Sequence, residues 1–501
     1  MRVYGIIVTK FVGGTFLLLG ILLGLFFKFH TNGILRQYFQ KKPLCKNCNV
    51  IMVSLDSLSA NHLPCYGYTR NTAPNLCAFA QQNILFTHTY ANATWTLPGH
   101  VSIFTGLFPS VHGVRNFGDT LGTSIPLLPE ILQKQGYKTI FDMPSHDPTL
   151  PIPDVYNRGI DAYNPDYPSW TQALADFKRH VSRGNKTFLF LHTYDVHLPY
   201  LIGRVPQLYP ADPIPGLPLI STEFDGTSSA YIDYLLKSLQ KSVDEETENP
   251  FVLDKFRSAI SIINEFRSNP TILTTKLQPY APYFVQVFQS FNYFSKIDIH
   301  NPRHIEYLKA LYDQNIHQMD EGRLSELLTF LRSHDIAKST VVIITADHGE
   351  EFMEHGNISH ETPYDSNLRI PLIIYYPGLG KPEKISDPVQ SADLVPTLLD
   401  MLGIVPTSRF QGESLVPAIR GQKLNSRLLI SDTQDLDKKI LRNTRWKLFL
   451  TLTDEGTYIP SELYDIVNDS GETTNVLFAH PDIAKQMFQE YQTNNVKWNP
   501  K

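Results

Sequence analysis

The chain has 501 residues, of which 42% are apolar and 12% aromatic, and its formal net charge is −5 at neutral pH. This composition is typical of a globular protein, and the length leaves room for two or three domains or for one large domain with an appendage. The acidic balance excludes the broad basic surface that a nucleic-acid-binding protein needs, so we expect no nucleic-acid partner.

The N-terminal segment is apolar. Residues 5–27 contain one charged side chain, Lys10, and as a helix they would reach about 35 Å, against about 30 Å for the hydrocarbon core of a bilayer. No small-residue cleavage site follows Phe27, so we expect a retained single-pass anchor within residues 1–30 rather than a cleaved signal peptide. Residues 31–48 then read as a linker. Basic residues lie on both sides of the span, and the positive-inside rule alone would keep the rest of the protein in the cytoplasm.

The sequence has four cysteines, Cys45, Cys48, Cys65 and Cys77. The first two have C-x-x-C spacing, but no second pair follows at zinc-finger spacing, so we expect no structural zinc site. A local disulfide in an exposed linker is the better interpretation if this part of the protein lies outside the cytoplasm. We expect Cys65 and Cys77 to be small buried hydrophobic residues.

Two apolar runs predict buried strands that end in metal-binding side chains. Residues 50–55 lead to Asp56, and residues 341–345 lead to Asp347 and His348. Ligands gather at the carboxyl ends of strands in open α/β sheets. Two carboxylates and an imidazole suit Zn or Mn, and a carboxylate-rich site also admits Ca or Mg. We therefore predict a divalent metal site formed by these three side chains.

A hydroxyl lies at a third strand end. An apolar strand pattern over residues 83–90 precedes ATWTLPGHVSIFTG, residues 93–106, which continues as a helix. Backbone N–H groups at such a turn stabilise an anion, so Thr96 is a candidate nucleophile, with His100 one helical turn further on. The alternative is that Thr96 is an ordinary helix N-cap.

Further histidines follow other predicted strands. Residues 187–191 lead into His192, Asp195 and His197, where one or two side chains could simply hydrogen-bond the loop backbone. His355 and His360 follow the second metal-binding strand within a glycine-containing loop. His355 could be structural.

The remaining pattern alternates helices and strands. A helix followed by a strand is predicted over 125–143, a helix containing Asp320 over 305–332, a core strand over 368–378 and a helix over 391–404. This alternation predicts an α/β fold with a large, mostly parallel, doubly wound sheet flanked by helices, over residues 49–407.

Two regions depart from that alternation. Residues 201–300 mix helical patterns with proline-rich loops, and could either cap the active-site face or form a peripheral helical excursion. Residues 408–501 form a smaller C-terminal α+β region, in which 442–450 and 461–467 read as strands of an antiparallel sheet.

Four of these motifs occur together in one order. They are NVIMVSLDSL, then APNLCAFAQQNILFTHTYANATWTLPGHVSIFTGLFPSVHGV, then ITADHGEEFMEHG, then ELYDIVNDSGETTNV, and they span residues 49 to 476. In this the sequence resembles the sulfatase branch of the alkaline phosphatase superfamily. The resemblance implies a four-stranded C-terminal subdomain and a catalytic domain outside the cytoplasm. It also implies that His197 contacts the substrate or leaving group, with His192 and Asp195 as supporting residues.

The sequence departs from the sulfatase signature, which is Cys or Ser, any residue, Pro, any residue and Arg, with the Cys oxidised to formylglycine. Thr96 stands at the Cys position and cannot form that group, and His100 stands at the Arg position. Ser57 replaces the second Asp of the family's Asp–Asp pair, and His360 replaces a catalytic lysine. These changes point to the Thr-dependent phosphodiesterases, phosphonate hydrolases and headgroup transferases of the superfamily.

The sequence thus predicts a membrane-anchored, metal-dependent hydrolase that cleaves phosphodiester, phosphonate or related esters of a small molecule, lipid or glycan. Its metal, Mn, Zn or Ca, would be held by Asp56, Asp347 and His348 together with the nucleophile Thr96. His100 would neutralise charge, and His197 or His360 would protonate the leaving oxygen. The alternatives are a phospho-alcohol headgroup transferase, a sulfuric ester hydrolase and a non-catalytic glycan-binding homologue.

Overall fold

A computed structural model describes most of the residues after position 41. The described residues are 42–116, 119–143, 158–164, 169–198, 200, 208–209, 236, 240, 260, 297–360, 362–406, 408–434 and 436–496. The predicted anchor, most of the linker and nearly all of the insertion over 201–300 lie outside them. Among the described helices, none combines the length and the apolar character that a bilayer crossing requires.

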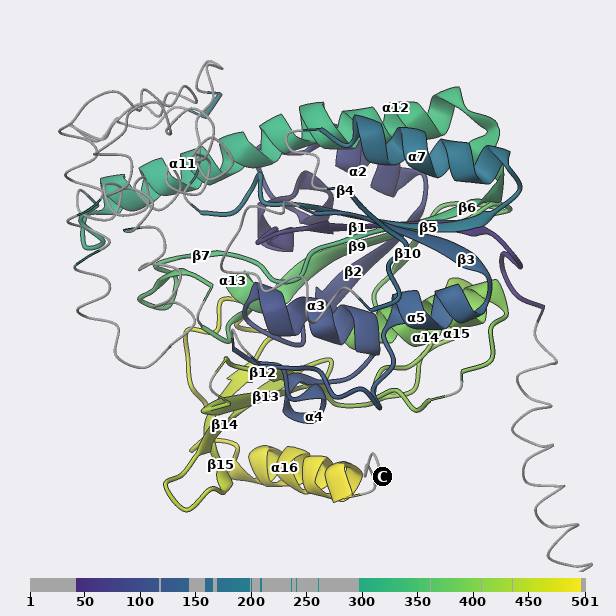
Figure 1. The fold of residues 1–501 in the computed structure, drawn as a ribbon. Helices are drawn as coiled ribbons and strands as arrows, with labels where there is room; N and C mark the ends of the chain where they lie inside the picture. The colour runs from purple at the N-terminus through teal and green to yellow at the C-terminus, as the bar shows by residue number, and fades with distance from the viewer. Residues whose placement is uncertain are drawn as a thin grey trace, which may run out of the picture.

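The body is built on a nine-stranded sheet with the strand order β10-β2-β9-β6-β1-β5-β3-β4, in which β11 also pairs with β2 (Figure 1). The strands are β1 (Asn49–Leu55), β2 (Ile84–Tyr90), β3 (Tyr137–Asp142), β4 (Ala162–Asn164), β5 (Lys186–Thr193), β6 (Thr340–Thr345), β9 (Arg369–Tyr375), β10 (Glu383–Ile385) and β11 (Val389–Gln390). All described pairings are parallel except those of β9, which runs antiparallel to β2 and β6. The sheet is therefore mixed, and mostly parallel as expected.

Helices cover both faces of this sheet (Figure 1). One layer contains α2 (Pro74–Gln81), α7 (Thr171–Ser182), α11 (Pro302–Met319) and α12 (Ser325–Ser333); the other contains α3 (Thr96–Thr105), α5 (Leu128–Lys134), α14 (Leu394–Leu402) and α15 (Val416–Ile419). In β1, Ile51 and Val53 enter the first apolar core, and Val50 and Met52 enter the second. Burial on both faces explains why this strand reads as a continuous apolar run.

The predicted helix over 305–332 is three helical segments in series. A π-helical turn, η6 (Asp320–Leu324), joins α11 to α12. The Asp320 carboxylate accepts hydrogen bonds from the backbone N–H groups of Asn75 and Leu76, both at 2.8 Å, at the start of α2. Asp320 therefore caps a neighbouring helix, where a carboxylate satisfies unpaired N–H groups.

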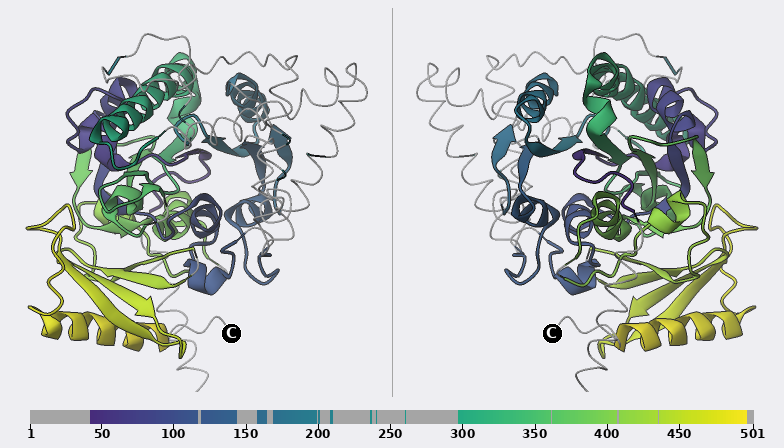
Figure 2. Two further views of the ribbon diagram at one scale, coloured as in Figure 1. Left: turned by 90° about the vertical axis from the view of Figure 1, so that its left-hand side faces the viewer. Right: turned by 90° about the vertical axis from the view of Figure 1, so that its right-hand side faces the viewer.

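A four-stranded antiparallel sheet forms the C-terminal region, as predicted. It contains β12 (Leu429–Asp432), β13 (Lys438–Arg442), β14 (Trp446–Leu452) and β15 (Tyr458–Asp465), and it lies beside α16 (Pro481–Val496) beneath the body (Figure 2). Asp365 of the short helix α13 (Asp365–Leu368) joins this sheet to the body, because its carboxylate pairs with Arg442 at 2.5 Å and Lys447 at 2.8 Å. These two cations hold the pKa of Asp365 well below its usual range despite its burial, which would raise it.

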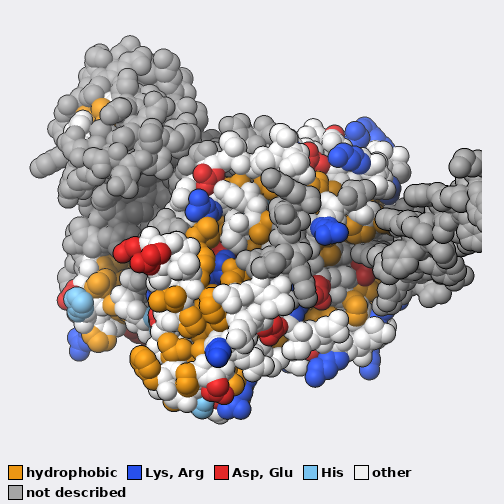
Figure 3. All heavy atoms as spheres, turned by 90° about the horizontal axis from the view of Figure 1, so that it is seen from below, with side chains coloured by type: hydrophobic (Ala, Val, Ile, Leu, Met, Phe, Trp, Pro, Cys, Tyr) orange, Lys and Arg blue, Asp and Glu red, His pale blue; other side chains and the backbone are white. Residues whose placement is uncertain are grey.

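Hydrophobic side chains are exposed on the face seen from below, interspersed with charged ones (Figure 3). Large apolar side chains exposed in the C-terminal region are Leu452, Ile459, Val467 and Phe478.

All four cysteines are paired. The Cys45–Cys48 disulfide confirms the local pairing, but both residues are buried rather than exposed, and the backbone N–H of Cys45 donates to the carbonyl of Met401. The expectation for the other two was wrong, because Cys65 and Cys77 form a second disulfide. Their Cα atoms lie 5.2 Å apart, where the loop after β1 meets α2.

Candidate metal centre and active site

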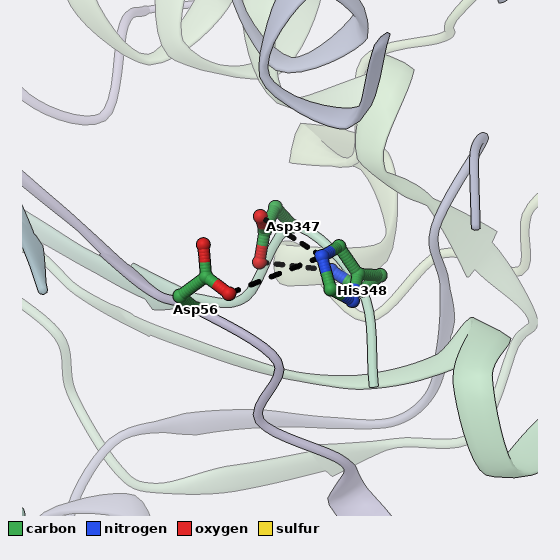
Figure 4. A group of neighbouring side chains, drawn as sticks. All are labelled: Asp56, Asp347 and His348. Carbon is green, nitrogen blue, oxygen red and sulfur yellow. Dashed lines mark hydrogen bonds and ion pairs between the residues drawn. The ribbon is translucent and has the colours of Figure 1, made fainter. Parts of the chain in front are cut away.

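Sheet register brings the predicted metal ligands together. Strands β1 and β6 are parallel neighbours with Ser54 opposite Thr345, so Asp56 and Asp347 lie opposite each other just beyond the paired ends. Asp56, Asp347 and His348 are fully buried, and each offers one ligand atom such that all three atoms lie within 4.8 Å of one another (Figure 4).

His348 is oriented for coordination. Its Nδ1 lies 2.9 Å from the Gly349 carbonyl oxygen, and because a carbonyl can only accept, Nδ1 carries the proton. Nε2 therefore presents its lone pair to the site, an arrangement typical of metal-binding histidines.

Ser57 supports both carboxylates. Its backbone is left-handed, with φ of 56°, which turns the chain sharply after Asp56. Its hydroxyl donates to Asp56 Oδ1 at 2.8 Å, and its N–H donates to Asp347 Oδ1 at 3.3 Å. Ser57 therefore gives a hydrogen-bond donor to each of the two carboxylates.

Thr96 is the first residue of α3, and the N-cap position is occupied by Trp95. The Thr96 hydroxyl lies 3.1 Å from His348 Nε2 and 3.3 Å from Asp56 Oδ2. This geometry does not match the N-cap interpretation and places the hydroxyl at the predicted metal site.

His100 is buried one turn further along α3. Its Nδ1 donates to the Thr96 carbonyl at 3.1 Å, and its Nε2 accepts from the Ser54 hydroxyl at 2.9 Å. Burial is the main reason why the pKa of His100 falls to about 4. At neutral pH the ring is therefore uncharged in this environment, which favours a role in holding the first turn of α3 over the predicted neutralisation of charge.

The polar residues at the end of β5 and just after it divide between two environments. His192, the last residue of the strand before Thr193, uses Nδ1 to donate to the Ser54 carbonyl at 3.1 Å, and its Nε2 lies 3.4 Å from Asp56 Oδ2 beside the candidate metal site. Asp195 instead pairs with Arg323 Nε at 2.6 Å. His197 uses Nδ1 to donate to the Leu198 carbonyl.

His197 and His360 lie near the candidate metal site. Their ring centroids are 5.4 Å apart, and the centroid of the His360 ring is 4.4 Å from that of His348. Burial alone would lower the pKa of His360, but hydrogen bonding and charge from Glu350 outweigh it and raise the pKa. His355 lies elsewhere, because it stacks on Tyr364 and its two ring nitrogens contact Glu351 and the Gly471 carbonyl. The structure thus selects His360 rather than His355 as a neighbour of the site.

The electrostatics of the site fit a divalent cation. Burial first, and then the charge of Asp56, raise the pKa of Asp347 to about 6. Asp347 Oδ2 is buried and accepts no hydrogen bond from the described residues. Burial lowers the pKa of His348 to about 3, so this imidazole is neutral and available as a ligand. Two buried carboxylates beside a neutral imidazole are stabilised by a bound cation.

Sequence reasoning missed two buried side chains near the site. Glu350 lies two residues after His348, and its Oε1 is 3.5 Å from His360 Nδ1; its place in the DHGE stretch was the available signal. Tyr312, on α11, donates from its hydroxyl to the Ser57 carbonyl at 2.6 Å and accepts from the Ser59 N–H at 2.9 Å. Tyr312 thus stabilises the loop after Asp56 although it is 255 positions from Ser57 in the sequence. No feature of the local sequence predicts this contact.

Comparisons with known proteins agree with this architecture. A sulfatase family model matches residues 48–404, and a model described as N-sulphoglucosamine sulphohydrolase, C-terminal, matches residues 353–497. Arylsulfatase K of Canis lupus familiaris is 27% identical over 203 residues, covering 38% of this chain and 37% of that protein. The match therefore spans little more than a third of that relative's length. Arylsulfatase K of Xenopus laevis is 24% identical over 467 residues, covering 88% of this chain and 81% of that protein.

Solved structures share the fold. The phosphonate monoester hydrolase of Agrobacterium radiobacter has a TM-score of 0.59 at 18% identity, covering 90% of this chain and 96% of that one. BT4656, solved with its substrate D-glucosamine-2-N,6-O-disulfate, has a TM-score of 0.56 at 20% identity, covering 92% of this chain and 99% of that one. The family model alone covers more than half of the sequence. The chain therefore belongs to the sulfatase family of hydrolases.

Proposed function

We propose that this protein is a divalent-metal-dependent ester hydrolase that uses Thr96 as its nucleophile and acts on a phosphodiester or phosphonate ester. The observation that carries the proposal is the position of the Thr96 hydroxyl, within 3.3 Å of side chains from both metal-binding strands. An unactivated hydroxyl is a weak nucleophile, so it needs a site that favours its deprotonated form.

Asp56, Asp347 and His348 would hold the metal ion. When bound, a divalent cation supplies the positive charge that favours the Thr96 alkoxide and the developing charge on the ester. The start of α3 adds backbone N–H groups around Thr96, which also favour an anion. Ser57 keeps both carboxylates in place through its two hydrogen bonds, and His192 lies beside Asp56.

The reaction would then proceed in two halves. The Thr96 oxygen attacks phosphorus, and the bond to the leaving oxygen breaks while His360 or His197 supplies a proton to that oxygen. Water next attacks the phosphorylated Thr96, which releases the acid and restores the hydroxyl. The histidines lie near the centre, with His360 beside His348, as this role requires.

The absence of an arginine one turn after Thr96 bears on the substrate. A planar guanidinium binds a dianion in two-point fashion, whereas the neutral His100 occupies this position. This supports a substrate whose reacting group carries a single negative charge, such as a phosphodiester or a phosphonate monoester, over one that carries two. Sulfuric ester hydrolysis is the second candidate, favoured by the sulfatase family model and by relatives named arylsulfatase K. The neighbouring structures include a phosphonate monoester hydrolase and a protein with a disulfated sugar substrate.

The test is a panel of aryl phosphate monoesters, phosphate diesters, phosphonate monoesters and sulfates, each assayed with Zn, Mn, Ca and Mg after removal of metal. We expect the diester or phosphonate to have the highest kcat/KM. If the sulfate has the highest kcat/KM instead, the protein is a sulfuric ester hydrolase rather than a phosphodiester or phosphonate hydrolase. Turnover that requires an added alcohol would indicate a headgroup transferase, and metal binding without any turnover would indicate a non-catalytic glycan-binding homologue.

We also propose that the catalytic domain lies outside the cytoplasm, anchored by residues 5–27. Two disulfides in the described part of the protein support this, because disulfides persist in oxidising compartments. A protease-protection assay on sealed cells or vesicles tests the orientation.

A further inference from the structure

Glu350 is a buried carboxylate without an ordinary hydrogen bond. Its side chain is 1% exposed, and both carboxylate oxygens are buried with no hydrogen-bond partner among the described residues. The one ion pair described for Glu350 joins its Oε1 to His360 Nδ1, at 3.5 Å. Burying a carboxylate without a hydrogen-bond donor costs free energy. An N–H group at His360 Nδ1 would be the donor that stabilises Glu350.

The backbone fixes the direction of Glu350. Gly349 donates its N–H to the Asn367 carbonyl at 2.6 Å, and a Cβ atom at position 349 would lie 2.3 Å from the Ser366 carbonyl oxygen. Only glycine fits this close approach of two chain segments. The residue that follows is therefore held against the site by the main chain.

The next residue, Glu351, provides a contrast at the adjacent position. It is equally buried, but its Oε1 accepts hydrogen bonds from the N–H and ring of His355, and its Oε2 accepts one from the Thr362 hydroxyl. Its hydrogen bonds stabilise the loop itself. Glu350 has no such structural duty in the described residues and faces the histidine beside the metal centre.

Only one ring nitrogen of His360, Nδ1, has polar contacts among the described residues. The contacts described for its ring nitrogens use Nδ1, which lies 3.1 Å from the Ser359 hydroxyl and 3.5 Å from Glu350. The His360 side chain is 17% exposed, whereas that of Glu350 is fully buried. Holding Nδ1 leaves Nε2 as the nitrogen available to a bound substrate.

We infer that Glu350 is a positioning residue that keeps the proton of His360 on Nδ1 and presents Nε2 to the leaving oxygen of the ester. This inference rests on the proposed hydrolase function. In this step His360 starts with a proton on each ring nitrogen. As the bond between phosphorus and the leaving oxygen breaks, that oxygen keeps the bonding electron pair and takes the proton from Nε2. The ring is left neutral, with its remaining proton on Nδ1 facing Glu350. The water that attacks phosphorylated Thr96 returns a proton to Nε2, and the Thr96 oxygen departs with the electron pair of its bond to phosphorus.

The experiment compares two esters of the same acid in full-length protein, one with a 4-nitrophenol leaving group and one with a simple alkyl alcohol. A 4-nitrophenolate leaves without help, whereas an alkoxide needs a proton in the transition state. We expect Glu350→Gln to lower kcat for the alkyl ester by about 10- to 100-fold, a part of the usual contribution of acid catalysis. Turnover of the nitrophenyl ester should stay within about threefold.

Glu351→Gln is the matched control, since it removes the same charge from the adjacent buried position. It should affect both esters alike. His360→Ala should show the same selectivity for the alkyl ester as Glu350→Gln, and the double variant should lose no more than His360→Ala, because the two residues act as one unit. Equal losses on both esters in Glu350→Gln, or additive losses in the double variant, would overturn the inference.

A second readout does not depend on turnover. Long-range ¹H–¹⁵N spectra of histidine-labelled protein, assigned with His360→Ala, report the tautomer of the neutral His360 ring. We expect the Nδ1–H form in the wild type and a shift toward Nε2–H in Glu350→Gln. An Nε2–H form in the wild type would overturn the positioning role. If the wild-type protein cleaves neither ester but shows the Nδ1–H form, the proposed function fails while the position of Glu350 stands.

Discussion

The Thr96 hydroxyl lies 3.1 Å from His348 Nε2, although the two residues are 252 positions apart in the sequence. One residue begins a helix on one face of the sheet, and the other follows a central strand. Since His348 directs its lone pair at the same point, this contact places a potential nucleophile within the cluster of candidate metal ligands.

Replacement of Thr96 tests the covalent mechanism. Thr96→Ser keeps the oxygen and should retain a measurable fraction of kcat, whereas Thr96→Ala removes the nucleophile and should lower kcat by roughly 10³-fold or more. Both variants should remain folded and bind metal. A kcat of Thr96→Ala within a few-fold of wild type would contradict this mechanism. A phosphate on Thr96 detected by mass spectrometry would support it directly.

Removal of one metal ligand should separate metal binding from folding. In Asp347→Asn the apparent metal affinity should fall by at least about 100-fold, and activity should fall in parallel. The metal-free variant should melt no lower than the metal-free wild type, because the substitution removes repulsion between two buried carboxylates. Asp195→Asn is the control, since Asp195 pairs with Arg323 away from the ligands. Full metal content with normal turnover in Asp347→Asn would remove Asp347 from the site.

Metal binding should weaken in acid. The folded, metal-free protein has a pKa of about 6 for Asp347, above the ordinary value of 3.8. Above pH 6 this carboxylate is ionised, which destabilises the metal-free fold and favours the cation; below pH 6 a proton competes with the metal. The apparent affinity should therefore drop by roughly tenfold for each pH unit below that point. Calorimetry in buffers of different ionisation enthalpy should find about one proton released per metal at pH 5 and almost none at pH 7.5. A flat profile between these values would contradict the raised pKa.

The second disulfide should contribute to stability. Cys65 and Cys77 are 12 positions apart, so their bond closes a short loop. The double variant Cys65→Ser/Cys77→Ser should lose about 3 kcal/mol of unfolding free energy and become insensitive to reductant at this position. Denaturant unfolding of both proteins measures the difference. An unchanged midpoint would show that the bond constrains neither the folded nor the unfolded state.

The N-terminal segment should remain attached. N-terminal sequencing of membrane-extracted protein should give Met1 or a residue close to it, because no cleavage site follows Phe27. A mature start near residue 30 or later would instead identify a secretory signal peptide.

The sequence by itself determined the strands and the candidate ligands at their ends. Apolar runs before Asp56 and Asp347 are local signals, and they predicted strands that are buried on both faces. Parallel strands in one sheet place their carboxyl ends at one edge, so the grouping of the candidate metal ligands followed from these runs. The order of the four motifs then led to the family that the comparisons show.

Tertiary structure decided which polar residues serve the site. Asp195 follows a predicted strand as the candidate ligands do, yet it pairs with Arg323. Likewise, His360 reaches the centre whereas His355 stacks on Tyr364. Local sequence shows only that a side chain is polar and near a strand end.

The same limit applies to the cysteine pair and to Glu350. Whether Cys65 meets Cys77 depends on how the loop after β1 packs against α2, and whether Glu350 meets His360 depends on the close approach of Gly349 to Ser366. Sequence periodicity reports how each segment buries its own apolar face. The partner of a buried polar group is set by contacts between segments distant in the sequence, and only the packed fold determines those contacts.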